Sequence, residues 1–480
     1  ELPMAKPEAQ DFVVSRYDRC VPIARSLRKC LLVCGGVAVV GLAALLWWPE
    51  PALPEWRGVD FGLDGTAASV FDPGKVLVFE LDLAPADLAR MQEYAAEELV
   101  VPASLKVGKE EVGAVGLRYK GATGTLHQVL KERRTEDFMP KLSLKVVFDH
   151  VVETRTFCGL RRLNFHSMIY DRSLMRDRLC YEVFRAAGFA TPRCSHAMLV
   201  VNGENLGLYA MVEQIDQAFV EDRFGAEAKG LLYKEVWPVH RDRAAYQEKV
   251  RSKPSGRRHD AMLGLAEALG SAEPSELPGA LARYADLDVL LRYLIVDQAL
   301  KNWDGVRGWT GVTADGDYWN HNYYWYVDLE QRLTLIPWDL DATLSHPGRR
   351  DHLPSWYDLG EPLGAGRLMS NGAFAWPPSK DRLIQAVAVH ARGRYQDVAR
   401  ALLDGPLALE RCLGLLDTWC AQVRPYVAHD PFLKARWPLI GSLWSWDYKL
   451  DKLRADLHEI RAWMEEQVRD WDDELPARFR

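Results

Sequence analysis

The chain has 480 residues, of which 48% are hydrophobic and 26% are charged, as in an ordinary folded protein with an ample core. The 60 lysines and arginines against 67 acidic residues give a net charge of −7. No basic run stands out, so the sequence offers no electrostatic basis for binding nucleic acid. The eight cysteines have neither zinc-site spacing nor the pattern of a disulfide framework, which favours free thiols.

An uncharged apolar run covers residues 30–48, about the length needed to cross the hydrocarbon of a membrane. Asp18 is the single acid among the basic residues that precede it, which are Arg16, Arg19, Arg25, Arg28 and Lys29. The positive-inside rule therefore places residues 1–29 in the cytoplasm and the main domain outside. A cleaved signal peptide is the alternative, but the run is long and ends in Trp47-Trp48-Pro49 rather than small residues. We expect a signal anchor, followed by a proline-stiffened linker over residues 49–74.

Strands are expected to dominate residues 75–216, the first part of the chain beyond the linker. The apolar patterns predict a strand, an amphipathic helix and two further strands, in the order Val76–Leu83, Pro85–Glu98, Val112–Tyr119 and Lys141–Phe148. A loop containing Gly121 and Thr123 follows the second strand. Glycines and hydroxyls at a strand end offer backbone N–H groups to a phosphate, although any hairpin does the same. The loop is therefore a candidate phosphate-binding segment.

The last of these strands carries two lysines on one face. Side chains alternate between the faces of a strand, so Lys141 and Lys145 point the same way. A lysine projecting from a strand toward the Gly121 loop suits the phosphates of ATP. A solvated strand face is the simpler alternative, and the pattern does not choose between the two lysines.

A helix and a hairpin follow. Ser173 is a suitable N-cap for a helix over Leu174–Ala187, and Gly188 fits the position after its end. Asn202-Gly203 is a strong signal for a hairpin turn. It predicts that the two flanking apolar runs, Ala197–Val201 and Leu206–Val212, pair as antiparallel strands. Glu213 comes directly after the second strand.

Residues 217–480 are expected to contain most of the helices, with helical periodicity dominating from Asp381 to Glu474. Earlier in this part, an apolar helix over Val289–Ala299 leads into a loop that contains Asp304. Asn322 follows in a second loop, and its amide can supply a neutral oxygen ligand to a metal.

A second acidic group lies at the end of a short buried strand. The apolar run Leu333–Ile336 stops at Pro337, and Asp339 and Asp341 follow it. They lie on the same side if the backbone stays extended. Paired carboxylates repel one another and favour a cation, and Mg²⁺ prefers carboxylates together with phosphate oxygens.

Asp304, Asn322 and Asp339 follow one another along the chain as a candidate base, an amide and a metal-binding carboxylate. The catalytic half of a protein kinase has these groups in the same order. The alternative is that aspartate and asparagine cap turns here, as they commonly do.

Several motifs closely resemble the spore-coat protein H (CotH) kinase family. They are Arg118-Tyr119-Lys120-Gly121, Pro140-Lys141-Leu142-Ser143-Leu144-Lys145, Asp171-Arg172-Ser173-Leu174-Met175-Arg176-Asp177-Arg178-Leu179, Asn202-Gly203-Glu204-Asn205-Leu206-Gly207-Leu208-Tyr209 and Pro337-Trp338-Asp339-Leu340-Asp341. The resemblance implies an α+β, atypical protein-kinase-like fold of two lobes, here preceded by one transmembrane helix. Residues 75–216 would form the nucleotide-binding lobe and residues 217–480 the catalytic and helical lobe.

The resemblance also implies roles for residues on the nucleotide side. Lys145 would contact the phosphates, with Lys141 as the alternative, and Gly121 and Thr123 belong to the loop beside them. Glu182, on the predicted helix, would pair with that lysine. Glu213 falls at the hinge between the lobes, where adenine would lie.

On the catalytic side, Asp304 matches the catalytic aspartate, Asn322 the metal-binding asparagine and Asp339 the principal Mg²⁺ or Mn²⁺ ligand, with Asp341 beside it. This chain departs from the family at Ala122-Thr123, where the family has Asn-Ser, and in the long interval between Asp304 and Asn322.

Two functions follow from these patterns. The first is a membrane-anchored kinase that transfers the γ-phosphate of ATP to serine or threonine of secreted or cell-envelope proteins. The second is a non-catalytic surface or adhesion protein on the same fold. The presence of Lys145, Asp304, Asn322 and Asp339 favours the first, because a module that only binds a partner needs none of them.

Overall fold

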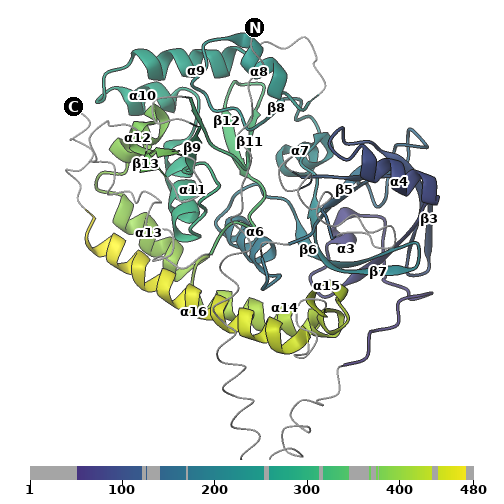
Figure 1. Cartoon of the computed structure of the whole chain (residues 1–480). Coiled ribbons are helices and arrows are strands. Elements are labelled where there is room, and N and C mark those ends of the chain that lie inside the picture. The colour runs from purple at the N-terminus through teal and green to yellow at the C-terminus, as the bar shows by residue number, and fades with distance from the viewer. Residues whose placement is uncertain are drawn as a thin grey trace, which may run out of the picture.

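The structure of the chain, a computed structural model, consists of a β-barrel and a larger part in which helices predominate (Figure 1). It describes residues 51–121, 126, 141–168, 171–252, 259–312, 317–344, 367–368, 374–376, 378–434 and 442–471. The predicted membrane segment over residues 30–48 and the candidate Thr123 lie outside these ranges. Within these ranges, no helix combines the length and the apolar character of a membrane span.

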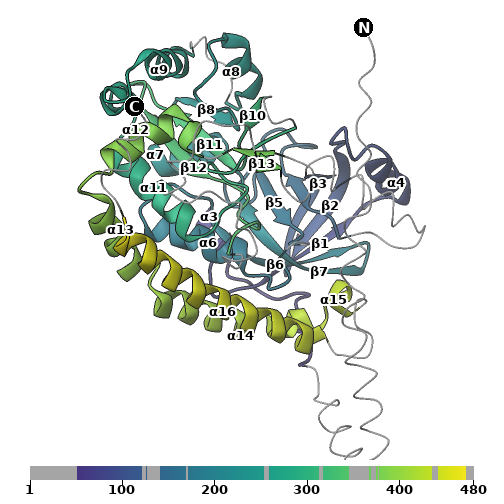
Figure 2. The ribbon, with the colours of Figure 1, turned by 60° about the vertical axis from the view of Figure 1, so that its left-hand side comes forward.

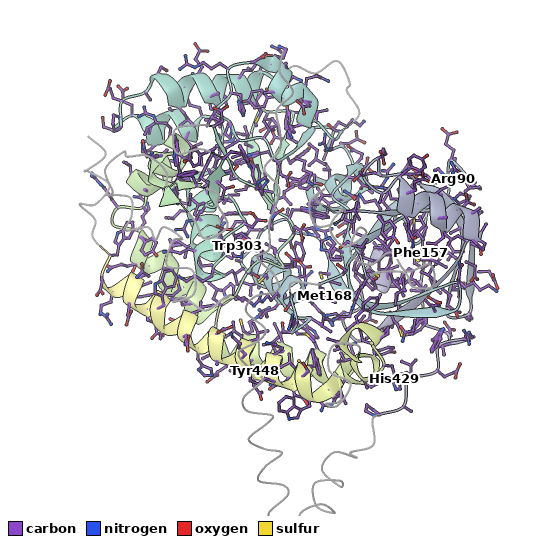
Figure 3. All side chains as sticks on the ribbon, viewed as in Figure 1. Arg90, Phe157, Met168, Trp303, His429 and Tyr448 are labelled. Atoms are coloured by element: carbon purple, nitrogen blue, oxygen red, sulfur yellow. The ribbon has the colours of Figure 1, made fainter. Side chains whose placement is uncertain are left out.

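Seven strands close into a barrel in the order β1-β2-β3-β4-β5-β7-β6. Neighbours are antiparallel except β1 and β6, which pair in parallel. The strands are β1 (Leu77–Asp82), β2 (Val101–Val107), β3 (Glu110–Tyr119), β4 (Leu144–Val147), β5 (Arg162–His166), β6 (Cys194–Val201) and β7 (Glu204–Glu213). Buried and exposed residues alternate along β2, so apolar side chains fill the barrel while polar ones face solvent. Phe157 lies inside the barrel (Figure 3), edge-on to Phe79.

The hairpin of β6 and β7 confirms its sequence signal. Asn202 and Gly203 have φ angles of 49° and 80°, the left-handed conformation that a type I′ turn requires at both central positions. β1, β3 and β4 also correspond to predicted strands, whereas β2 and β5 have no predicted counterpart.

The helix α6 (Arg176–Ala186) begins two residues later than predicted, and Ser173 is not its N-cap. Asp171 takes over the capping role, because its Oδ1 accepts from the Ser173 N–H at 3.0 Å and its Oδ2 accepts from the Arg176 N–H at 2.7 Å. A carboxylate that binds two backbone donors holds Leu174 in a left-handed conformation, with φ of 63°, just before the helix.

The remaining strands form two small sheets. One sheet has the order β12-β11-β8 and the other β10-β9-β14-β13. Their strands are β8 (Leu231–Lys234), β9 (Trp309–Gly311), β10 (Tyr318–Trp319), β11 (Tyr323–Val327), β12 (Leu333–Pro337), β13 (Arg367–Leu368) and β14 (Phe374–Trp376). β12 confirms the predicted buried strand. This part of the fold is therefore mixed α/β, with helices prevailing toward its C-terminal end.

Two short helices belong to the barrel, α3 (Ala67–Val70) and α4 (Pro85–Glu93). The other helices are α7 (Gln217–Phe224), α8 (Arg243–Lys249), α9 (Asp260–Ser271), α10 (Leu277–Ala282), α11 (Leu287–Ala299), the 3₁₀ turn η4 (Pro378–Lys380), α12 (Arg382–His390), α13 (Tyr395–Asp404), α14 (Leu409–Ala428), α15 (Pro431–Lys434) and α16 (Ser442–Arg469). Figure 2 shows α14 and α16 side by side, running toward the barrel and meeting α15 at its end.

A buried ion pair joins the barrel to these C-terminal helices. The Lys141 ammonium donates to Asp430 Oδ2 at 2.7 Å, and the Leu208 N–H of β7 donates to the same oxygen at 3.0 Å. Asp430 Oδ1 accepts from the Phe432 N–H at the start of α15. Gly207 has φ of 82°, and a Cβ there would lie 2.2 Å from Asp430 Oδ2. Only glycine fits this close approach without displacement.

Arg178 of α6 makes a second connection. Its guanidinium donates to Pro73 O at 2.8 Å and to Gln422 Oε1 of α14 at 3.0 Å, and it lies over the Trp419 ring. It also donates to Nδ1 of His196, whose Nε2–H donates to Leu174 O. Burial, and then the charge of Arg178, lower the pKa of His196 to about 3, so this histidine is a neutral structural group.

We expect Asp430→Ala to lower the free energy of unfolding by about 3–5 kcal/mol, because it leaves the Lys141 ammonium buried without its counter-charge. Urea unfolding of parent and variant measures the change. Glu227→Ala, in an exposed surface pair with Lys229, is the matched control and should change it by less than about 1 kcal/mol. Equal, small effects of both substitutions would contradict a joining role for Asp430.

Candidate active site

The site is built around the turn that follows β12. Strand β12 pairs with β11 so that Pro337 lies opposite Tyr323, and the Trp338 N–H donates to Asn322 O at 3.1 Å. Pairing of the two strands therefore brings Asn322 beside Asp339. Both residues adopt left-handed backbone conformations, with φ of 62° and 50°. Such strained positions cluster at functional sites.

The backbone leaves the extended conformation at Asp339, so the condition under which Asp339 and Asp341 would share one side of a strand is not met. Contacts with one face of α6 hold the turn. Residues at i, i+3 and i+4 of a helix share a face, and here these are Asp177, Cys180 and Tyr181. The Tyr181 hydroxyl accepts from the Asp339 N–H at 2.9 Å, and Asp177 Oδ1 accepts from the Leu340 N–H at 3.0 Å. The helix thus fixes the position of the Asp339 carboxylate.

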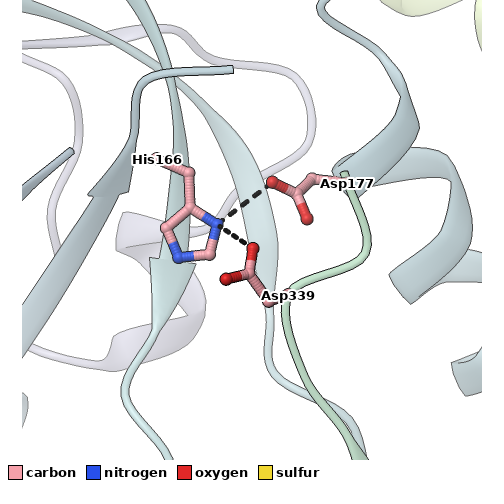
Figure 4. Close-up of side chains that lie close together, drawn as sticks. All are labelled: His166, Asp177 and Asp339. Carbon is pink, nitrogen blue, oxygen red and sulfur yellow. Dashed lines mark hydrogen bonds and ion pairs between the residues drawn. The ribbon is translucent and has the colours of Figure 1, made fainter. Parts of the chain in front are cut away.

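His166 connects this carboxylate to the barrel (Figure 4). Its Nδ1 lies 3.1 Å from Asp177 Oδ2 and 3.7 Å from Asp339 Oδ1. On the other side of the ring, the Lys120 Nζ lies 2.7 Å from His166 Nε2 and 5.3 Å from the centre of the Trp338 ring. With Lys120 donating to Nε2, the Nδ1–H faces the two carboxylates.

The three groups in Figure 4 also have the spacing of a metal site. His166, Asp177 and Asp339 each offer one ligand atom, and these atoms lie within 4.8 Å of one another. Carboxylate oxygens suit Mg²⁺, and a carboxylate set that includes an imidazole also suits Mn²⁺. Asp339 is the member that faces solvent, with 38% of its side chain exposed.

Asp304 lies in the loop after α11, close to Trp303 (Figure 3), and the structure brings it to Asn322. The Asn322 amide donates to Asp304 Oδ2 at 2.8 Å and to Asp304 O at 3.1 Å. The long interval between Asp304 and Asn322 contains the paired strands β9 and β10. The chain therefore runs away from Asp304 along β9 and comes back to it along β10. The predicted juxtaposition of Asp304, Asn322 and Asp339 is thus present in the structure.

The three aspartates of the site differ in charge state because their surroundings differ. Burial, together with Asp339 and Glu235, raises the pKa of Asp304 to about 6, against the lowering effects of His321 and Asn322. Burial would also raise the pKa of Asp339, but the electrostatic effects of His166, Lys120 and Lys234 outweigh it and lower that pKa. Asp339 is therefore the most readily ionised of the three aspartates.

Asp341 behaves in the opposite way. Burial first, and then the charges of Asp339, Asp177, Asp171 and Asp304, raise the pKa of Asp341 well above its ordinary range. A cation bound between Asp339 and Asp341 would remove this repulsion, as expected for a pair of metal ligands.

The two candidate lysines lie in different surroundings. Lys145, on β4, pairs in register with Arg118 of β3 and Asn164 of β5. Burial and the nearby charges of Arg118 and Lys120 lower its pKa well below the ordinary value, and no hydrogen bond or ion pair joins its ammonium group to another described residue. Lys141 precedes β4 and is bound to Asp430.

Glu213 lies at the end of β7 with its carboxylate held by two arginines, Arg193 at 2.6 Å and Arg223 at 2.7 Å. Gly121 follows β3 with φ of 136°, in an exposed position where a Cβ would meet nothing within 4 Å. Thr123 lies outside the described residues.

Glu182 does not pair with a barrel lysine. It lies five residues beyond Asp177, on a different face of α6, and its carboxylate binds Arg185 of the same helix and Arg411 of α14. The acid of α6 that faces the site is Asp177.

Sequence reasoning assigned no role to Lys120, His166 or Asp177, although Lys120 and Asp177 lie within motifs that were recognised. The available signal was the helical spacing of Asp177 and Tyr181, which places both on the face opposite Glu182. Sequence reasoning also assigned no role to Glu235, whose Oε1 accepts from the Asn322 N–H at 3.3 Å.

Comparison with known proteins identifies the family of the chain. The family model for "CotH kinase protein" matches residues 117–467, most of the chain, and the chain belongs to the CotH kinase family. One relative is the inner spore coat protein H of Bacillus subtilis, 23% identical over 367 residues, which cover 74% of this chain and 89% of that protein. Another is invasin CotH2 of Rhizopus delemar, 23% identical over 286 residues, which cover 54% of this chain and 45% of that protein.

Among solved structures, the complex of HipA, HipB and operator DNA from Shewanella oneidensis MR-1 is similar at a TM-score of 0.31 and 10% identity. The match covers 80% of this chain and 81% of the matched chain.

The raised pKa of Asp304 predicts how this residue affects stability. The folded state holds its proton more tightly than the unfolded state, so its contribution to stability is full below pH 4 and is lost as the pH rises through about 6. We therefore expect Asp304→Asn to gain stability relative to the parent between pH 4 and pH 7.5.

Thermal unfolding in the presence of a chelator measures this difference. Asp397→Asn, which removes a carboxylate that is 87% exposed, should show no such gain. A pH-independent difference between the parent and Asp304→Asn would contradict the raised pKa.

Proposed function

We propose that this chain is a CotH-type protein kinase that transfers the γ-phosphate of ATP to a serine or threonine hydroxyl of a protein. The observation that supports it most directly is the hydrogen bond from Asn322 to the Asp304 carboxylate beside the ionised Asp339. Membership of the CotH kinase family supports the same reaction class.

Asp339, with Asn322 and Asp341, would hold a Mg²⁺ or Mn²⁺ ion. When bound with ATP, this metal neutralises charge on the phosphate oxygens. The residues fit a cation, because Asp339 is ionised and partly exposed, while burial and the neighbouring carboxylates raise the pKa of Asp341, whose ionised form a bound cation would favour. His166 contacts the Asp339 carboxylate, and Asp177 binds the N–H of the next residue, Leu340.

The nucleotide would lie between the barrel and this metal site. We assign Lys145 to the phosphates, rather than Lys141, because Lys141 is bound to Asp430 whereas Lys145 has no such partner among the described residues. The loop of Gly121 and Thr123 would approach the phosphates. Glu213 would lie at the adenine end of the nucleotide; its carboxylate is held by the two arginines and its N–H donates to Arg193 O at 3.0 Å.

Asp304 would orient the acceptor hydroxyl and take its proton. A pKa of about 6 leaves most of this carboxylate ionised at pH 7 and still basic enough to accept a proton. The hydrogen bond from Asn322 fixes the oxygen that would approach the hydroxyl.

We expect Asp339→Asn to fold like the parent but to weaken metal-dependent ATP binding by at least about tenfold, or ~1.4 kcal/mol, because it removes a charged ligand and keeps the shape. Titration calorimetry with Mg·ATP measures the affinity, and Asp397→Asn is the control with the same loss of charge. If Asp339→Asn binds Mg·ATP as tightly as the parent, the carboxylate has another role.

Two substitutions test the chemistry itself. Asp304→Ala should reduce phosphate transfer by about 10²–10⁴-fold and leave ATP affinity nearly intact, because it removes the base alone. Lys145→Ala should weaken ATP binding and slow transfer, because it removes positive charge from the phosphates. Lys229→Ala, an exposed lysine, is the control.

The measurement is transfer of label from γ-labelled ATP to the protein itself or to a generic seryl protein. A merely structural role predicts lower melting temperatures for both variants and no separation of binding from turnover. No transfer and no ATP binding by the parent, across Mg²⁺ and Mn²⁺, would exclude the kinase.

For location, we propose a single-pass membrane protein anchored through residues 30–48, with the kinase domain outside the cytoplasm and acting on secreted or envelope proteins. The cluster of basic residues before the apolar run supports it. A reporter that is active only in the cytoplasm, fused after Arg480, should be inactive in cells. An active fusion would overturn the topology.

The second candidate function is a non-catalytic surface protein. It is favoured by the name of one relative, an invasin, and by the exposed Trp444, 63% accessible, which suits a binding surface. The label-transfer experiment separates it from the kinase.

A further inference from the structure

A charged cavity lies where the start of α6 meets α16, apart from the Asp304 and Asp339 carboxylates. Figure 1 shows α16 passing beneath α6. The cavity has a volume of about 140 Å³. Its charged lining consists of four cations and two carboxylates, which are Arg172, Arg176, Lys449, Lys452, Asp171 and Asp456.

The two carboxylates are buried and one of them is already saturated. Asp171 is 1% exposed, and both of its oxygens accept backbone N–H groups, from Ser173 and from Arg176. Asp456 is 4% exposed. The four basic side chains are only partly buried and reach the cavity from both elements. The lining therefore has an excess of two positive charges.

Two of the cations have hydrogen-bonding capacity to spare. The Arg176 Nε is buried without a hydrogen-bond partner, and it lies 3.8 Å from Asp171 Oδ1, too far for a hydrogen bond. The ammonium group of Lys452 forms no hydrogen bond or ion pair within the part of the chain that the structure describes. Buried polar groups in proteins are normally satisfied, so an unpaired guanidinium N–H beside a lysine points to a missing acceptor.

The frame of the cavity is fixed. Trp446 of α16 is fully buried, and its indole N–H donates to Ser173 O at 2.8 Å. Leu453, one turn from Lys449 and beside Lys452, is 2% exposed and closes one side. The basic groups are therefore held around the cavity before any ligand arrives, which reduces the entropic cost of binding.

We propose that this cavity binds a phosphomonoester dianion, that is, the phosphate of a phosphorylated side chain or free phosphate. The volume exceeds that of several water molecules, and guanidinium and ammonium groups bind phosphate oxygens through charge-assisted hydrogen bonds. The Arg176 N–H at the start of α6 is already used by Asp171, so we assign the binding energy to the basic side chains.

An anion here bears on the active site through α6. Arg176 is followed directly by Asp177, whose carboxylate binds the Leu340 N–H and His166. Occupation of the cavity would therefore restrain the same helical turn that positions Asp339. Phosphate binding itself does not depend on the proposed kinase reaction.

Titration of the purified chain with inorganic phosphate, followed by phosphorus NMR or calorimetry, tests the proposal. The double variant Arg176→Gln with Lys452→Gln should bind phosphate at least about tenfold more weakly than the parent. Arg469→Gln, on the same helix outside the cavity and paired with Asp470, should bind like the parent. The single change Lys452→Gln, which breaks no described contact, guards against misfolding of the double variant and should also weaken binding.

Two further titrations distinguish the sources of the phosphate. A phosphoserine peptide that binds more tightly than inorganic phosphate, while the unphosphorylated peptide does not bind, would identify a phosphorylated side chain as the ligand. Equal affinities would identify free phosphate. The proposal is overturned if the parent does not bind phosphate at millimolar concentrations, or if the Lys452 and Arg176 variants bind it as well as Arg469→Gln does.

Discussion

One face of helix α6 holds the turn after β12, and the rest of the site depends on this contact. The Tyr181 hydroxyl and the Asp177 carboxylate accept the N–H groups of Asp339 and Leu340, which forces Asp339 into a left-handed conformation. Without these bonds, the alternation of an extended strand would decide where the carboxylate points. The contact also joins two parts of the chain that are far apart in sequence, because α6 follows β5 of the barrel whereas Asp339 follows β12.

Electrostatics then separates the roles of carboxylates that lie close together. His166, Lys120 and Lys234 lower the pKa of Asp339 and keep it ionised, whereas burial and mutual repulsion raise the pKa values of Asp304 and Asp341. Environments that push the pKa values of neighbouring acids apart are typical of catalytic sites. The arrangement costs stability in the absence of ligand, and a metal with its nucleotide would recover part of it.

Local patterns predicted a good part of this fold, and long-range contacts explain what they missed. Asn202-Gly203 determined its hairpin, and the run Leu333–Ile336 determined β12, because turn conformation and apolar burial are local properties. The partner of Lys141 is 289 residues away at Asp430, and no spacing in the sequence indicates it. For Asp177, helical spacing shows which face of α6 it lies on, but not that this face contacts the turn at Leu340, 163 residues away.

The central claim is that Asp339 binds the metal that accompanies ATP, next to the Asp304–Asn322 pair. A crystal structure of the chain with Mn²⁺ and a non-hydrolysable ATP analogue tests it most directly, because manganese can be located by its anomalous scattering. The account predicts a manganese peak in contact with the Asp339 carboxylate, with the terminal phosphate between it and Asp304. A peak that contacts neither Asp339 nor Asp341, or a nucleotide bound outside this site, would contradict it.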